Sequence, residues 1–278
     1  MNDAERYEFD RLGYAVIPDL LTGEQVASLV PVVDALEEHA VENVDKPPRK
    51  RGGWGTEGHR NPEKGYQVHG SRGEGKTIII EDFWNTDPAF DFLIDLPHTM
   101  EWVNAVVRGR PTINNSEIRI RYKGNQSSAH GGGGRPDNHK YRYNADREGI
   151  DCMMVRMVYF IHDVTDEQGA FSVVPGSHKS CFPNPYQTNS DTMRGMIGLE
   201  VKAGDGIFFT EALTHGGLTN HSDQVRKTLH VGYGPNWMLS QNAVTADEPQ
   251  YLTEETRSRL TEERRDLLRS WPEHPKPR

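Results

Sequence analysis

Residues 203–228 read AGDGIFFTEALTHGGLTNHSDQVRKT. Within them, Ile207–Phe209 follows a Gly-Asp-Gly turn and is a short apolar strand candidate. His215 closes this run with two glycines behind it, so a strand that ends here can present an imidazole at the mouth of a barrel. Arg226 comes eleven residues later. A turn and a return strand of that length bring its guanidinium beside His215, where it can bind a carboxylate through two parallel hydrogen bonds.

The same pattern of short strands extends over the second half of the chain. The strand candidates are separated by Gly, Pro, Asp and Asn turns, with few helices between them. They are Ile118–Tyr122, Met153–Ile161, Phe171–Val174, Ile207–Phe209 and Thr228–Tyr233. Many short strands with few helices favour a β-sandwich or a jelly-roll barrel.

The amino-terminal segment predicts a helix, a strand and a second helix. Phe9 belongs to an apolar helix face that Gly13 ends, and Tyr14–Ile17 is a short strand candidate. Thr22 stands three residues before Gln25, which is the arrangement of a capping box. Apolar residues at helical spacing follow the box, so we expect the second helix to pack against a core.

Two segments differ in composition from the rest of the chain. Residues 46–76 hold eight Lys or Arg against three Glu, with many Gly and Pro. A solvated surface loop and a mobile lid that covers an anionic substrate both fit this composition. Residues 246–278 are polar and predict a peripheral helical tail, centred on Thr253–Leu268. We expect residues 1–278 to form a single domain.

Composition excludes several classes of protein. The net charge of -9 argues against binding to nucleic acid or to an anionic membrane surface. No stretch approaches about 18 apolar residues, and the chain starts with acidic rather than apolar residues, so we expect neither a membrane span nor a secretion signal. Only Cys152 and Cys181 are present. Two cysteines exclude a disulfide framework and predict a cytoplasmic location.

His130 is a second histidine at a strand exit, in the run AHGGGG. Its glycines indicate either a tight turn or a close approach of the backbone to a neighbour. An iron(II) oxygenase needs two imidazoles, usually a carboxylate, and open positions for a keto acid and dioxygen. His130 and His215, with Arg226 downstream, match that need.

Two further runs carry more specific motifs. FDRLGYAVIPDLLTGEQVASL lies near the amino terminus, and VYFIHDVTDEQGAFSVVPGSHKS occupies residues 158–180. With the stretch 203–228 they resemble the phytanoyl-CoA dioxygenase superfamily of iron(II)/2-oxoglutarate oxygenases. The resemblance extends from Tyr7 to Tyr233, and the PGSHK box followed by His-x10-Arg is specific because both motifs occur in order.

The resemblance implies a mainly β fold with flanking helices on a double-stranded β-helix, a cupin-like jelly-roll core. It implies iron(II) and 2-oxoglutarate as cofactors, His215 as the distal metal ligand and Arg226 as the residue that binds the far carboxylate of 2-oxoglutarate. Thr228 would add a hydroxyl contact there. We predict an enzyme that uses dioxygen to hydroxylate a small-molecule substrate, releasing succinate and CO2. The basic segment 46–76 indicates an anionic substrate. His178, in the PGSHK turn, is expected to be structural or adjacent to the substrate.

The chain departs from the family at its first metal motif, His-x-Asp, where it reads His130-Gly-Gly132. Three explanations are open. Asp137 could loop back and complete the metal site with His130 and His215, because an anionic oxygen ligand holds iron(II) more tightly. A site without a carboxylate would resemble the halogenases of this class, in which chloride takes the vacant position. His139 could instead be the first ligand.

Other functions also stay open on the sequence alone. The same cofactors support chlorination, desaturation and oxidative demethylation, and a cupin-like barrel could bind a metal or a ligand without turnover. Arg226 argues against such a binding barrel, which needs no clamp for 2-oxoglutarate. His221 and His230 flank the turn before and after Arg226, and we expect them to be solvated and buried in the core, respectively.

Overall fold

The computed structural model describes residues 1–52, 55–131, 142–182, 184–238 and 251–268. Their helices, including three 3-10 turns labelled η, are α1 Asp3–Leu12, α2 Gly23–Asn43, η1 Phe83–Asn85, η2 Pro88–Leu93, α3 Pro97–Val106, η4 Ser177–Lys179, α4 Glu254–Arg259 and α5 Glu262–Leu267. The strands form a large sheet, a smaller sheet and a separate hairpin.

All strand pairs are antiparallel. The large sheet has the order β1 Tyr14–Ile17, β13 Gly206–Thr210, β10 Val155–Phe160, β15 Arg226–Pro235, β6 Pro111–Arg121, β5 Thr77–Glu81, β4 Gln67–Gly70, β3 Glu57–Arg60, β2 Arg49–Arg51. The smaller sheet has the order β12 Ile197–Leu199, β11 Phe171–Val173, β14 His215–Gly217, β7 Ser127–His130, and the hairpin pairs β8 Tyr143–Asp146 with β9 Gly149–Cys152. The predicted mainly β fold with a cupin-like jelly-roll core is confirmed.

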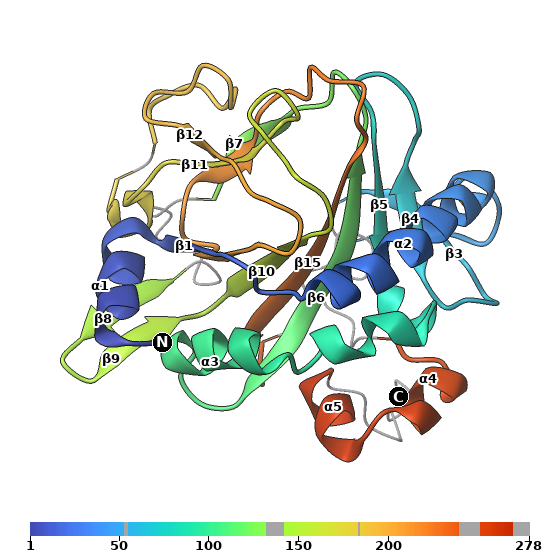
Figure 1. Cartoon of the computed structure of the whole chain (residues 1–278), viewed down its shortest axis with the longest axis horizontal. Helices are drawn as coiled ribbons and strands as arrows, with labels where there is room; N and C mark the ends of the chain where they lie inside the picture. Colours follow the sequence, from blue (N-terminus) through green and yellow to red (C-terminus); the bar gives the residue numbers. More distant parts are fainter. Residues whose placement is uncertain (53–54, 132–141, 183, 239–250, 269–278) are drawn as a thin grey trace.

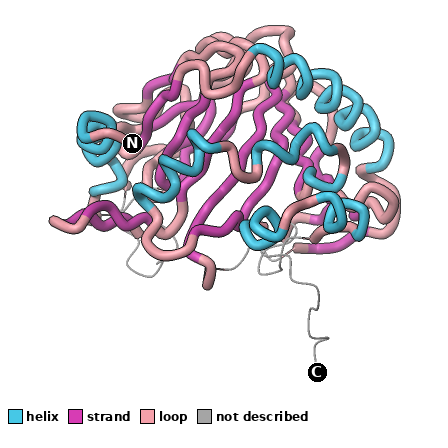
Figure 2. Tube along the Cα trace, turned by 60° about the horizontal axis from the view of Figure 1, so that its bottom comes forward, coloured by secondary structure: helices cyan, strands magenta, loops and turns pink. Residues whose placement is uncertain are grey.

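Helices cover one face of the large sheet. Figure 1 and Figure 2 show α2 and α3 lying across its strands, with the smaller sheet on the opposite side. A large apolar cluster fills the space between helices and sheet, and it includes Leu29 and Val33 of α2 and Trp102 of α3. A second, smaller apolar cluster lies mainly on the strands of both sheets and includes Phe160 and Phe171.

The amino-terminal prediction is confirmed in detail. Helix α1 ends at Gly13, whose φ of 82° lies in the left-handed region that glycine adopts without strain. The Thr22 side chain accepts from the Gln25 backbone N–H, and the reciprocal contact is present, so the capping box begins α2 as expected.

Two predicted segments turn out differently. Residues 46–76 are not an irregular loop, because they contribute strands β2, β3 and β4 to one edge of the large sheet. If this segment forms a lid over the substrate, that lid therefore consists of paired strands. Of the predicted tail 246–278, residues 246–250 and 269–278 lie outside the described part. The described portion forms two short helices, and its Leu260 and Leu268 are buried against the large apolar cluster rather than peripheral.

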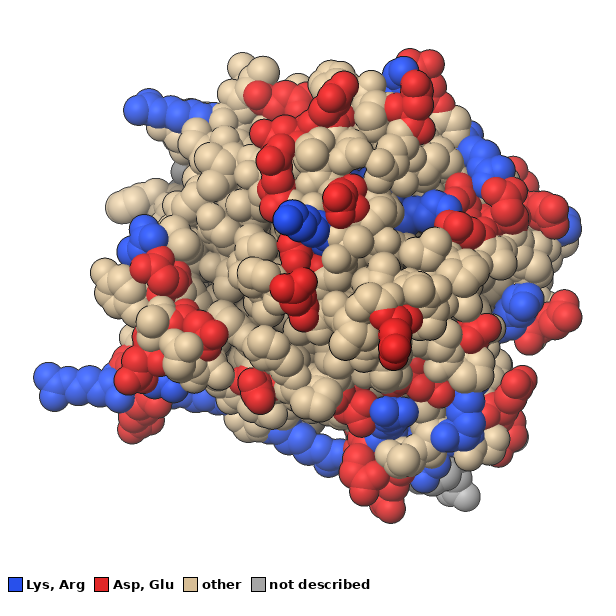
Figure 3. All heavy atoms as spheres, viewed as in Figure 1, with Lys and Arg blue, Asp and Glu red and all other residues tan. Residues whose placement is uncertain are grey.

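Two observations concern the helices and the surface of the described residues. None of these helices combines the length and apolar character that a bilayer crossing requires. On the face shown in Figure 3, Asp and Glu side chains are spread among Lys and Arg, with no continuous basic area.

Candidate metal and cosubstrate site

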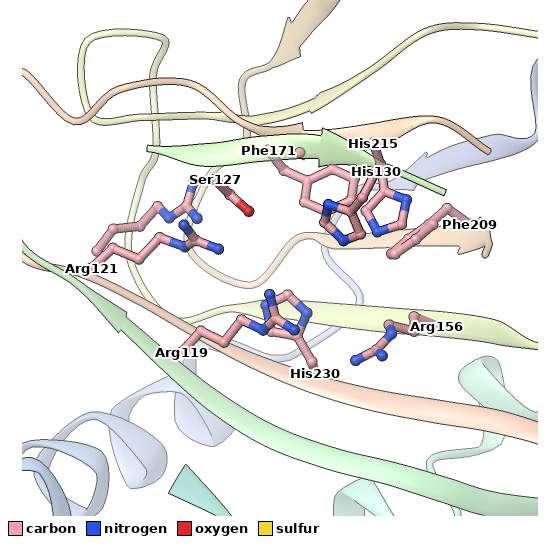
Figure 4. A pocket seen from close by; sticks show the side chains of 11 residues that line it. Arg119, Arg121, Ser127, His130, Arg156, Phe171, Phe209, His215 and His230 are labelled. Carbon is pink, nitrogen blue, oxygen red and sulfur yellow. The ribbon is translucent and has the colours of Figure 1, made fainter. Parts of the chain in front are cut away.

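Two histidines stand side by side in the smaller sheet. Strands β7 and β14 are neighbours, and His130 is directly opposite His215 in their register. The centroids of the two imidazole rings are 4.3 Å apart, and Figure 4 shows both rings at the same wall of a cavity. Two residues 85 positions apart in the sequence are therefore brought together by a single strand pairing.

Both imidazoles are held in the form that binds a metal. Nδ1 of His130 lies 2.8 Å from the Ser128 carbonyl oxygen, and Nδ1 of His215 lies 2.9 Å from that of Leu213. A carbonyl can only accept, so each Nδ1 carries the proton and each Nε2 keeps a free lone pair. Carbonyl contacts of this kind fix the orientation of metal-binding histidines.

The surroundings also keep both rings neutral. Desolvation lowers the pKa of His130, although part of this side chain is exposed at the rim. Burial, followed by the charge of His130, lowers the pKa of His215 to about 3. Since a ligating imidazole must be unprotonated, the pair fits a divalent metal at neutral pH.

Glycines allow the two strands to approach each other. A Cβ at Gly131, whose φ is 73°, would come within 2.6 Å of the Leu213 carbonyl oxygen. A Cβ at Gly216 would lie 2.4 Å from Ser190 Oγ and 2.7 Å from the Ser127 carbonyl oxygen. The glycines after each histidine therefore mark close backbone approach. His215 itself begins β14, after a turn that follows β13, rather than ending a strand as predicted.

The opposite wall of the cavity is rich in arginine. Arg119 and Arg121 extend from β6, Arg156 from β10 and Arg226 from β15, and all four line the cavity with the two histidines. Figure 4 shows the side chains of Arg119, Arg121 and Arg156 reaching into the space below the imidazoles. Arg226 and Arg121 are directly opposite each other in the β15–β6 register.

Two of the arginines are neutralised by glutamates. Arg119 Nε donates to Glu117 Oε2 at 2.6 Å, and Arg156 donates to Glu211 Oε1 and to Asn115. Burial alone raises the pKa of Glu117, but the charges of Arg119 and Arg156 outweigh it and lower that pKa below its ordinary value. Both glutamates are therefore ionised.

The other two arginines are buried cations without an acidic partner among the described residues. Arg121 donates to Asn125 at 2.9 Å and Arg226 donates to the Gly169 carbonyl oxygen, while the Nε of each has no hydrogen bond partner. Burial, and then the charge of Arg119, lowers the pKa of Arg226 to about 9. Burial, and then the charge of Arg226, lowers the pKa of Arg121 well below its ordinary value. Since buried charges need partners, this pair is suited to an anionic ligand.

Thr228 and His230 lie on the same side of β15 as Arg226. Thr228 Oγ1 is 2.9 Å from His230 Nε2, and His230 lines the cavity whereas Thr228 is absent from its lining. The predicted contact between Thr228 and 2-oxoglutarate stays a prediction. His230 is buried, as predicted, but it faces the cavity rather than the apolar core.

The remaining histidine predictions divide between described and undescribed residues. Asp137 and His139 lie in 132–141, outside the described residues. Among the described residues, no three His, Cys, Asp or Glu side chains already stand in metal-binding positions. His178 is structural, because its Nε2 bonds the Asp10 carbonyl oxygen at 3.0 Å and its ring packs edge-on against Tyr143. His221 is exposed, as predicted.

Sequence reasoning missed Arg119, Arg121, Arg156 and Glu211. The signal for the first two is present in Ile118-Arg-Ile-Arg-Tyr122, because a strand of period two places both arginines on one face. Arg156 is the single charge in a nearly continuous apolar strand. Buried charges of this kind indicate a site, since Arg is almost never fully buried without a partner.

Solved structures share this fold. HygX from Streptomyces hygroscopicus, crystallised with nickel and 2-oxoglutarate, is 20% identical, with a TM-score of 0.69 over 86% of this chain and 89% of that one. The epimerase SnoN from nogalamycin biosynthesis is 17% identical, with a TM-score of 0.56 over 83% of this chain and 81% of that one. The carbocyclase SnoK from the same biosynthesis is 17% identical, with a TM-score of 0.57 over 85% of each chain.

Sequence comparisons agree with this fold. The dioxygenase olcK of Penicillium canescens is 32% identical over 87 residues, which are 30% of this chain and only 26% of the fungal protein. The model of the phytanoyl-CoA dioxygenase (PhyH) family matches residues 9–228, most of the chain. The chain therefore belongs to the phytanoyl-CoA dioxygenase family, whose members are dioxygenases that use iron(II) and 2-oxoglutarate.

Proposed function

We propose that this enzyme hydroxylates a small molecule and releases succinate and CO2. The observation that carries the proposal is the cavity itself. On one wall, two neutral imidazoles have free Nε2 lone pairs, and on the other Arg121 and Arg226 are buried without acidic partners among the described residues. One wall suits a divalent metal, and the other suits the dianion 2-oxoglutarate.

Each of these residues then has a defined role. His130 and His215 would hold iron(II). That Asp137 is the carboxylate ligand stays a prediction, because it lies outside the described residues. Arg226 would bind the far carboxylate of 2-oxoglutarate, with Arg121 beside it, because paired guanidiniums match a carboxylate in charge and in hydrogen bonding. The bound metal and keto acid supply the oxidising chemistry, and the protein binds, orients and excludes water.

Two aromatic rings shield the metal side of the cavity. The Phe209 ring centroid is 4.6 Å from that of His215, and the Phe171 ring stacks on His215 at 5.8 Å. Both rings line the cavity, so they lower the local dielectric constant around the imidazoles and keep water from them.

The charge balance of the cavity favours an anionic substrate. Four arginines face two glutamates among the described residues, and 2-oxoglutarate would neutralise the excess. The charge of iron(II) then has to be matched by a carboxylate ligand and by the substrate. HygX has been crystallised with hygromycin B bound, which supports a small molecule as the substrate class for this fold.

The test is anaerobic reconstitution with iron(II) followed by single turnover. We expect 2-oxoglutarate to give a visible charge-transfer band with the wild-type protein and none with Arg226→Met. On exposure to oxygen with a panel of carboxylated and phosphorylated small molecules, succinate should form together with a product that has gained one oxygen atom. An absence of both the band and succinate would contradict the proposal.

Halogenation is the second candidate, favoured by the sequence His130-Gly-Gly132, which has no carboxylate at the family position. The same turnover with bromide in place of chloride distinguishes the two outcomes. A brominated product would replace hydroxylation as the function, and an oxygenated product under these conditions would exclude halogenation.

A further inference from the structure

Glu211 is a buried carboxylate to which the roles above give only the pairing with Arg156. It lies in the turn between β13 and β14, four residues before His215, and only 4% of it is exposed. Its backbone N–H donates to the Met154 carbonyl oxygen at 3.0 Å, and the turn is closed by a bond of 2.9 Å from Leu213 N to the Thr210 carbonyl oxygen. The position of Glu211 is therefore fixed by the same turn that positions His215.

The two oxygens of Glu211 face different groups. Oε1 accepts from Arg156 Nε, whereas Oε2 lies 3.9 Å from Nε2 of His215. The proton of His215 is on Nδ1, so its Nε2 carries a lone pair and lies 3.9 Å from a carboxylate oxygen. Two electron-rich atoms that lie 3.9 Å apart on buried side chains repel unless a cation lies between them.

A metal ion is the cation that suits this arrangement. The carboxylate of Glu211 forms a buried ion pair with Arg156, so it is an anion. Atoms bound at right angles to one metal about 2 Å away are about 3 Å apart. A shift of about 1 Å in the Glu211 side chain would bring Oε2 to that separation from His215 Nε2.

We propose that Glu211 supplies the carboxylate of the iron site together with His130 and His215, in place of the aspartate that the chain lacks after His130. Oε2 binds the metal, and Arg156 holds Oε1 and so orients the carboxylate. The proposed ligands are then His130 on β7, Glu211 in the turn between β13 and β14, and His215 at the start of β14. This inference rests on the proposed iron(II) function, and it makes Asp137 dispensable for metal binding.

Cobalt(II) titration by calorimetry tests the ligand set without turnover. We expect Glu211→Gln, which keeps an acceptor for Arg156, to weaken cobalt(II) binding at least about 100-fold, because even substitutions outside the ligand shell cost 10–100-fold. Asp137→Asn should leave it unchanged, as should Glu167→Gln, a matched control at an exposed carboxylate. His215→Ala sets the scale for losing a ligand.

A second variant separates ligation from folding. Glu211→Gln removes the nearer of the two carboxylates beside Arg156, whose Nη1 is also 3.8 Å from Glu117 Oε1. Glu211→Gln/Arg156→Met removes both charges of the Glu211–Arg156 pair and should still fail to bind cobalt(II), with thermal unfolding of the metal-free protein close to wild type. The proposal is overturned if Asp137→Asn loses the metal, or if Glu211→Gln and the double variant keep it. Failure of the wild-type protein to bind cobalt(II) would instead overturn the proposed function itself.

Discussion

The two faces of strands β6 and β15 carry side chains of different chemical character. On the helix side, Ile118 and Ile120 of β6 and Leu229 and Val231 of β15 belong to the large apolar cluster. On the cavity side, the residues between them are Arg119 and Arg121 on β6 and Thr228 and His230 on β15. Most of these side chains are buried, yet the helix side is mainly aliphatic and the cavity side is made of cations and hydrogen-bonding groups.

The difference separates stability from function within a single pair of strands. Burying aliphatic side chains stabilises the fold by roughly 1.5–3 kcal/mol for each side chain. Burying guanidiniums costs free energy unless an anion is supplied. The helix side therefore stabilises the sheet. The cavity side lowers the stability of the ligand-free protein, because this site is complete only when its ligand is bound.

The largest expected effect comes from removing one cation of the cavity. Arg226→Met should weaken binding of 2-oxoglutarate by about 2–5 kcal/mol, a rise in Kd of about 30-fold or more, because it removes a buried charge that pairs with the ligand. The unfolding temperature of the ligand-free protein should not fall, because the substitution removes a buried charge that has no acidic partner among the described residues. Calorimetry and thermal unfolding measure the two quantities.

The matched control is Arg108→Met, at an exposed arginine that pairs with Asp146 on the surface. It removes the same charge from the chain and should change neither quantity. If Arg226→Met destabilised the ligand-free protein and left the Kd for 2-oxoglutarate unchanged, Arg226 would belong to the structural side of the comparison.

A substitution on the helix side should lower the stability of the fold and leave the binding of 2-oxoglutarate unchanged. Ile120 is fully buried, and Ile120→Ala should lower the free energy of unfolding by about 2–5 kcal/mol through lost burial and the cavity left behind. Urea denaturation measures this loss. In the folded protein, the Kd for 2-oxoglutarate should stay at its wild-type value. Val16→Ala, at a β-branched strand residue that is 37% exposed, should cost less than about 0.5 kcal/mol.

The same two faces explain how far the sequence could predict the molecule. The alternation in Ile118–Tyr122 and the apolar run Met153–Ile161 predict strands correctly, because period two and β-branched side chains depend on local geometry alone. The capping box at Thr22 and the glycine at 13 are equally local. The surface-loop alternative for residues 46–76 was wrong, because pairing at the edge of a sheet depends on a partner strand that composition does not reveal, and the lid alternative stays a prediction.

The site was predictable only where a motif or a resemblance named its residues. His215 and Arg226 come from one stretch, and the structure places both on the cavity. Arg121 also lines the cavity, and Glu211 contacts two lining residues, Arg156 and His215. The importance of Arg121 follows from its burial and from the register of β6 against β15, and that of Glu211 follows from its burial in the turn after β13. Those facts are long-range, so the spacing of residues along the chain does not contain them.

The smallest expected effects come from two neighbours on opposite faces of β15. Lys227 points to the helix side, where its Nζ lies 2.5 Å from Asp34 and 2.6 Å from Glu37 of α2. Glu37 keeps Tyr122 at 2.7 Å and Arg72 at 3.0 Å when the lysine is lost, so no buried carboxylate is left alone. Lys227→Met should therefore lower the free energy of unfolding by only about 1 kcal/mol and leave 2-oxoglutarate binding unchanged.

Thr228, one residue later, points to the cavity side. Thr228→Val keeps the shape of the side chain and removes only its hydrogen bond to His230, a loss of about 1 kcal/mol. Since His230 lines the cavity, that loss should appear as a rise of less than about tenfold in the Kd for 2-oxoglutarate, measured beside Lys227→Met. If the effects were exchanged, with Lys227→Met weakening the ligand and Thr228→Val only the fold, the division between the two faces would not hold at this end of β15. A weakening seen for Thr228→Val alone would extend the site one residue beyond Arg226 along the cavity face, which is where the sequence resemblance placed it.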